Sequence, residues 1–103
     1  MDKQYIVQVD DNYHYADESE RYCAGTFAML NQAIQVCEAI TIESLKSVYE
    51  PGITAGKLSS QWAMFGDDPF ITGDVDDVAF SARKFITEEL CTKIIKEIET
   101  VTQ

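Results

Sequence analysis

The residues best suited to chemistry gather near the N-terminus, between residues 6 and 24. This segment holds the only histidine of the chain, His14, among clustered tyrosines and carboxylates. Carboxylates near an imidazole raise its pKa into the range used for general acid–base catalysis, and the same groups bind divalent metals. Their mixed oxygen and imidazole donors would favour zinc, manganese or iron over calcium. The candidate ligands for a metal ion or a small molecule are Asp10, Asn12, His14, Asp17 and Glu18.

No other pattern completes a site for catalysis or for a bound ion. A calcium loop needs a glycine at its sixth position and an acid at its twelfth, but counting from Asp10 gives Tyr15 and Arg21. Cys23 would need His14 as its base, and no third group stands ready to orient the pair. The sequence contains neither a hydrolase elbow nor a glycine-rich phosphate loop. It therefore predicts no catalytic residues and no cofactor.

Aromatic and acidic residues indicate a second kind of function, the binding of a partner protein. We prefer this hypothesis of a non-enzymatic interaction or regulatory protein, because the chain offers such a surface and lacks an assembled catalytic set. The partner includes a second copy of the chain, which an exposed hairpin edge or a long helix could contact. The residues expected to form the partner surface are Tyr13, Tyr15, Tyr22, Asp67 and Asp68.

Charge and composition narrow the choice of partner and location. The chain carries 18 acidic and 8 basic residues, a formal net charge of −10, which repels phosphate backbones and anionic lipid. We therefore expect no nucleic-acid or membrane partner, and no apolar run approaches the ~18 residues that span a bilayer. The three cysteines are far apart and odd in number, which argues against a disulfide framework or a zinc site. With no recognisable signal peptide, a cytoplasmic location is expected.

The N-terminal third has the pattern of a β-hairpin. Apolar and β-branched residues alternate with other residues, which predicts a strand over residues 4–14. A second extended run covers residues 21–27, and the polar residues 16–20 join the two strands as a turn. Residues 10–12 are poor strand formers, which indicates a bulge or a bend there.

Helical periodicity dominates the middle of the chain. Apolar residues at three- and four-residue steps predict a long helix over residues 29–49. A shorter helix should begin after Thr54 as its N-cap and end at Gly66. Its aromatic residues Trp62 and Phe65 are expected to pack in the core and not to line a partner-binding groove, and residues 67–69 should break the chain. Residues 70–72 are short, apolar and β-branched, and they offer a third strand beside the hairpin.

A last helix is expected after Ser81. Ser81 is placed as its N-cap, Phe80 and Phe85 would form a hydrophobic staple, and an apolar stripe runs on to Thr100. The order is β-β-α-α-(β)-α, an α+β fold of one domain over residues 1–103 in which the hairpin packs against three helices. The predicted core is Val7, Val9, Leu30, Ile34, Cys37, Leu45, Trp62, Phe85, Leu90 and Ile94.

Five distinctive segments are spread along most of the chain. They are V-D-D-N-Y-H-Y (residues 9–15), D-E-S-E-R-Y (17–22), Y-E-P-G-I-T-A (49–55), F-G-D-D-P-F-I (65–71) and F-S-A (80–82). In these segments the chain resembles a small family of uncharacterised bacterial proteins. The resemblance implies a stand-alone bacterial domain of about this length with no established activity, so it assigns no role to any residue.

Overall fold

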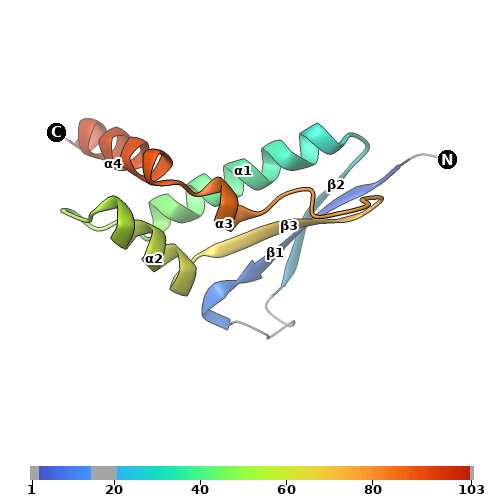
Figure 1. Cartoon of the computed structure of the whole chain (residues 1–103), viewed down its shortest axis with the longest axis horizontal. Coiled ribbons are helices and arrows are strands. Elements are labelled where there is room, and N and C mark those ends of the chain that lie inside the picture. Colours follow the sequence, from blue (N-terminus) through green and yellow to red (C-terminus); the bar gives the residue numbers. More distant parts are fainter. Residues whose placement is uncertain (1–2, 15–20, 103) are drawn as a thin grey trace.

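A three-stranded antiparallel sheet and a group of helices make up the chain, as Figure 1 shows. The computed structural model describes residues 3–14 and 21–102. The strands are β1 (Tyr5–Asp11), β2 (Tyr22–Phe27) and β3 (Asp67–Gly73), in the spatial order β2-β1-β3. The helices are the short 3-10 helix η1 (Asn12–His14), α1 (Leu30–Ser47), α2 (Ala55–Phe65), α3 (Ala82–Phe85) and α4 (Glu88–Thr102). The predicted α+β fold is confirmed.

Strand β1 lies in the middle of the sheet and forms the predicted hairpin with β2. It is shorter than predicted, because it ends at Asp11 and the next three residues turn into η1. The turn is held by two hydrogen bonds: the Tyr13 amide donates to Asp11 Oδ1 at 2.9 Å, and the Asn12 amide donates to the Gly66 carbonyl at 2.9 Å. Asn12 and His14 therefore do not continue the strand alternation that would place them beside Asp10. The predicted turn at residues 16–20 lies outside the described residues.

A bulge or a bend was predicted for residues 10–12, and the bulge of the hairpin lies elsewhere. Val7 is opposite Gly25 and Gln8 is opposite Cys23, so Ala24 is the extra residue of a bulge in β2. Residues 10–12 instead mark the end of the strand. The bend is therefore the alternative that fits, because the chain leaves the strand after Asp11 and turns into η1 at Asn12.

Strand β3 confirms the predicted third strand and extends it in both directions. It runs antiparallel to β1 along its full length, and it includes Asp67, Asp68 and Pro69, which we expected to be a break in the chain. The proline is tolerated because β3 is an edge strand, where an amide that points outward needs no partner in the ladder.

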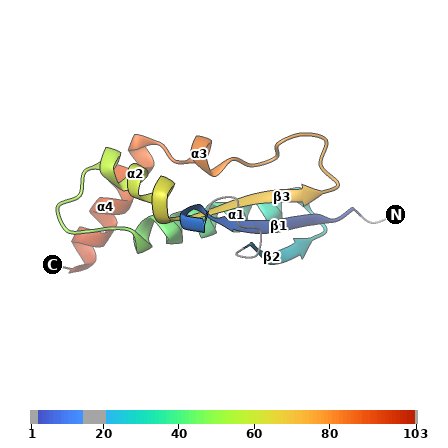
Figure 2. The ribbon, with the colours of Figure 1, turned by 90° about the horizontal axis from the view of Figure 1, so that it is seen from below.

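Helix α1 covers one face of the sheet. Figure 1 shows α1 running along the strands, and in Figure 2, turned by 90°, the strands lie in front of it. Tyr5, Val7 and Ile71 from the strands pack against Ala33 and Cys37 of this helix. The side chains on the other face of β1 and β3 are only half-buried. The sheet therefore has one packed face and one open face, a common arrangement for antiparallel sheets.

A second group of buried residues joins the helices to one another. It brings together Leu45 of α1, Leu58 and Trp62 of α2, and Cys91 and Ile94 of α4. Phe80 contacts both buried groups and links them. Six of the ten predicted core residues are buried, namely Val7, Val9, Cys37, Leu45, Trp62 and Ile94, while Leu30, Ile34, Phe85 and Leu90 are half-buried. The chain measures 51 × 27 × 21 Å, and so narrow a shape surrounds few side chains on all sides.

The last helix is divided into two, which corrects the prediction of one continuous helix. Ser81 caps α3 as expected, with the Lys84 amide 3.4 Å from Ser81 Oγ, and the rings of Phe80 and Phe85 lie 5.7 Å apart. Helix α3 nevertheless ends at Phe85. Thr87 then begins α4 by accepting a hydrogen bond of 3.1 Å from the Leu90 amide. A second N-cap followed by two acidic residues is the signal that marks this new start.

Helix α2 begins and ends where the sequence predicted. The Lys57 amide donates to Thr54 Oγ1 at 3.2 Å, and Gly66 closes the other end. Gly66 is needed for close packing, since a Cβ atom there would collide with the Trp62 ring and lie 2.8 Å from Ser44 Oγ. Across residues 3–14 and 21–102, no helix has the length and apolar character needed to cross a membrane.

Candidate functional site

Four carboxylates meet where β1 ends and β3 begins. In the antiparallel register, Asp10 is directly opposite Asp68 and Asp11 is directly opposite Asp67. We call these four residues the acidic strand end. Because successive side chains of a strand point to opposite faces, Asp10 and Asp68 share the open face, whereas Asp11 and Asp67 share the face of α1. Each face of the sheet therefore carries one pair of like charges at this end of β1 and β3.

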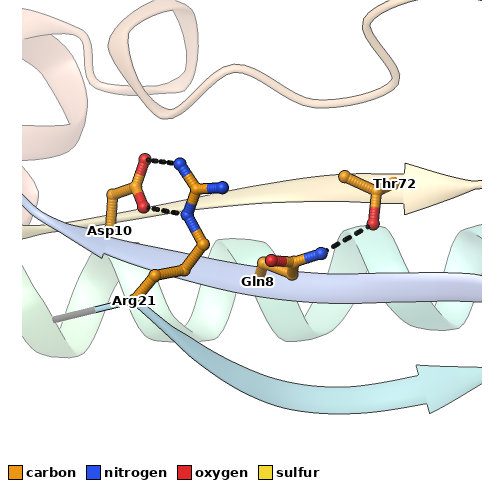
Figure 3. Close-up of polar contacts among 4 residues, drawn as sticks. All are labelled: Gln8, Asp10, Arg21 and Thr72. Carbon is orange, nitrogen blue, oxygen red and sulfur yellow. Dashed lines mark hydrogen bonds and ion pairs between the residues drawn. The ribbon is translucent and has the colours of Figure 1, made fainter. Parts of the chain in front are cut away.

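The pair on the open face has arginines beside it. Arg21 makes a bidentate contact with Asp10, with distances of 2.6 Å from Nε and 3.2 Å from Nη2, as Figure 3 shows. The Arg21 guanidinium also lies 5.0 Å from the ring centroid of Phe70, and the charge of Arg83 lowers the pKa of Asp68. Burial and the charge of Asp10 act in the opposite direction, and the net effect is a raised pKa for Asp68.

The pair on the α1 face has a different environment. Burial, followed by the charge of Asp11, raises the pKa of Asp67 above its ordinary value. The backbone of Asp67 is fixed on both sides, since its amide donates to Ser44 Oγ at 2.7 Å and its carbonyl accepts from Trp62 Nε1 at 2.9 Å. Its carboxylate makes no ion pair with any residue in the part of the chain that the structure describes. Asp67 is thus a carboxylate that is held in place and lacks a cation.

A cavity of about 320 Å³ opens beside Asp67 on the same face. We call it the α1-side cavity. Residues from three elements line it: Tyr22 of β2, Asp67 of β3, and Ala39, Ile40, Glu43, Ser44 and Ser47 of α1. Burial and the charge of Asp67 raise the pKa of the Tyr22 hydroxyl, so this phenol stays neutral. The cavity therefore combines an apolar wall, an aromatic ring, hydroxyl groups and two carboxylates.

Exposed aromatic rings lie next to the acidic strand end. The rings of Tyr13 and Phe65 stack at a centroid distance of 5.6 Å, and their side chains are 66% and 49% exposed. We had expected Phe65 to belong to the core, and this was wrong: it is the last residue of α2, where the ring meets η1 and not the helix interior. Asn12 Nδ2 donates to the Trp62 carbonyl at 3.0 Å, which attaches η1 to this end of α2.

The predicted metal or ligand site is only partly covered by the structure. Asp10 is engaged by Arg21, and the Asn12 side chain is engaged by Trp62. His14 belongs to η1, while Asp17 and Glu18 lie outside the described residues, as does Tyr15 of the predicted partner surface. Among the residues that are described, no three histidine, cysteine or acidic side chains are placed to hold a metal ion. The hairpin metal site stays a prediction.

The cysteines are placed for packing. Burial, with the charges of Glu38 and Asp68, raises the pKa of Cys37 to about 11, so its thiol stays protonated at neutral pH. Burial also raises the pKa of Cys91. Cys23 is exposed on β2, where it is opposite Gln8. Protonated thiols are poor nucleophiles, so the two buried cysteines behave as small apolar residues.

A larger groove of about 1060 Å³ follows α4. Its charged lining is balanced, with three lysines and three glutamates, so electrostatics selects neither an anion nor a cation. The residues concerned are Lys46, Lys93, Lys96, Glu88, Glu89 and Glu97, beside Ile98 and Val101. The acidic strand end and the α1-side cavity have a clear sign of charge and are therefore the better candidate site.

The sequence had selected the residues of this site in two unconnected groups. It assigned Asp10 and Asn12 to a ligand site and Tyr13, Tyr22, Asp67 and Asp68 to a partner surface, and the structure brings all six to one end of the sheet. Glu43 and Ser44 were missed, because only the packing of α1 on the sheet brings them to Asp67.

Comparisons of the chain with protein-family models, with curated proteins and with solved structures found no match.

Proposed function

We propose that the chain is a non-enzymatic interaction protein that binds a basic surface of a partner protein at the acidic strand end. The observation that carries this proposal is the pairing of Asp10 with Asp68 and of Asp11 with Asp67 across neighbouring strands. Carboxylates that are directly opposite each other oppose folding. A cationic partner would relieve that repulsion. The paired carboxylates would therefore favour binding, although they do not favour folding.

The surroundings of the acidic strand end support binding of a protein in particular. Tyr13 and Phe65 present a stacked pair of exposed rings beside the carboxylates. Aromatic rings supply contact area to protein partners and attract lysine and arginine side chains through cation–π interactions. The net charge of −10 would steer a basic partner toward the chain and repel nucleic acid.

A titration followed by NMR tests this proposal. We expect a short lysine–glycine peptide to shift the amide signals of residues 10–13 and 66–68 of the ¹⁵N-labelled chain, and to do so more strongly at low salt. A glutamine–glycine peptide of the same length is the matched control. Equal shifts in the acidic loop that follows β3, at residues 74–77, would show unspecific attraction and would contradict the proposal.

A cytoplasmic location is part of the same proposal. All three cysteines are free thiols, and Cys23 is exposed. Free exposed thiols persist in reducing compartments, whereas oxidising compartments favour disulfides. Location of a tagged chain by fractionation of cells, with a known secreted protein as a control, would test this part.

A further inference from the structure

The α1-side cavity has the size and chemistry to hold one cationic side chain. We infer that it anchors a single arginine side chain of the partner, with the stem on Ile40, the guanidinium against the Tyr22 ring, and the charge shared by Glu43 and Asp67. This inference rests on the proposed function, since it names the group that the basic partner would insert. It places the anchor on the α1 face, away from the carboxylates that face Arg21 and Arg83.

The two faces of the acidic strand end differ in how their charges are compensated. On the open face, Arg21 binds Asp10 and the charge of Arg83 acts on Asp68. On the α1 face, Asp67 has no ion-pair partner among residues 3–14 and 21–102. An incoming cation would therefore find its best position at Asp67, where it would not have to displace an arginine of the same chain.

The walls of the cavity match the parts of an arginine side chain. Ala39 and Ile40 provide an apolar surface for the methylene groups, and the half-exposed Tyr22 ring can stack on a planar guanidinium. A volume of about 320 Å³ fits one side chain and excludes a folded segment. The lining residues come from β2, β3 and α1, so the cavity exists only in the folded chain.

The polar groups of the cavity can accept the hydrogen bonds that a guanidinium donates. Glu43 is only loosely paired with Lys46, at 3.8 Å, and its side chain is 76% exposed, so it can turn toward a ligand. Ser44 Oγ accepts one hydrogen bond, from the Asp67 amide, and Ser47 Oγ donates one to the Ser44 carbonyl. Each hydroxyl oxygen therefore keeps a lone pair that can accept from a ligand. Arginine has five donors in a fixed plane and so uses several acceptors at once, whereas lysine offers a compact point charge.

The test is an NMR titration of the ¹⁵N-labelled full chain with N-acetyl-arginine amide. We expect shifts at the amides of Tyr22, Ser44 and Asp67, weaker shifts with N-acetyl-lysine amide, and none with the citrulline analogue, which has the same shape without the charge. Glu43→Gln should weaken binding about two- to fivefold, as expected for one partly exposed ion pair. Glu97→Gln on α4 is the matched control and should leave binding unchanged.

The outcomes separate this inference from the proposed function. Equal binding of the citrulline analogue, or unchanged affinity in Glu43→Gln, overturns the arginine anchor. If the lysine–glycine peptide still shifts residues 10–13 in that case, the proposed function survives without the anchor. Glu43 is exposed, so its variant should fold, and the amide spectrum of the free variant verifies this directly.

Discussion

Replacement of Asp67 by asparagine should stabilise the protein at neutral pH. Burial and the charge of Asp11 raise the pKa of Asp67 in the folded state. A carboxyl group whose pKa is higher in the folded than in the unfolded state stabilises the fold while it is protonated, at pH values below its unfolded-state pKa. This stabilisation is lost as the pH rises through the folded-state pKa. At pH 7 the ionised Asp67 therefore opposes folding, and Asp67→Asn removes that opposition while keeping the size of the side chain.

The expected gain is modest but measurable. Like charges directly opposite each other on antiparallel strands typically cost about 0.2–1 kcal/mol. For a chain of this size, a gain of this order raises the melting temperature by roughly 1–8 °C. The side chain of Asp67 is partly open to solvent at the cavity, so salt should screen the effect, and low ionic strength is the best condition.

Thermal unfolding followed by circular dichroism at two pH values is the assay. The variant should be more stable than the wild type at pH 7, and the two should converge near pH 3, below the ordinary carboxyl pKa of 3.8. Asp76→Asn, in the exposed loop after β3, changes the net charge by the same amount and should have little effect. A destabilised Asp67→Asn, or an equal gain in Asp76→Asn, would show that the Asp67 carboxylate does not oppose folding through its pairing with Asp11.

Three other experiments test the fold. Gly66→Ala should cost about 1–3 kcal/mol because its Cβ would collide with a buried ring. Gly56→Ala, with open space around it inside α2, should stabilise by up to about 1 kcal/mol, and urea unfolding of both variants compares them. Thr87→Ala should cost about 1 kcal/mol, since it removes the cap of α4, and retention of full stability would show that the cap is dispensable. A thiol reagent should modify Cys23 rapidly in the native protein and the buried Cys37 only on unfolding, and fast reaction of both would contradict the described packing.

Local signals in the sequence were sufficient for the elements. Thr54 and Ser81 were identified as N-caps from residue type and position, and both cap their helices. The alternation that buries Val7 and Val9 gave the central strand. These features depend on neighbours within a few residues, which is why one sequence suffices to find them. The interruption before α4 also had a local signal in Thr87, which the long apolar stripe obscured.

The candidate site depends on contacts that are distant in the sequence. Asp10 and Asp68 were both recognised as polar surface residues, but their pairing follows from the register of β3 on β1. Glu43 joins them only through the packing of α1 on the sheet. Phe65 was misplaced for the same reason, because its partner Tyr13 belongs to a turn that the strand pattern did not reveal. Tertiary pairing of this kind has no signature in periodicity or composition.

Calorimetric binding of the lysine–glycine peptide to two charge-matched variants tests whether the peptide binds at the acidic strand end. Asp11→Asn with Asp67→Asn removes the pair on the α1 face, and Asp76→Asn with Glu97→Gln removes two exposed charges elsewhere. We expect only the first variant to lose affinity, and the salt dependence of its binding to fall as well. Equal affinities for the two variants would show that net charge alone attracts the peptide and would contradict a binding site at the acidic strand end.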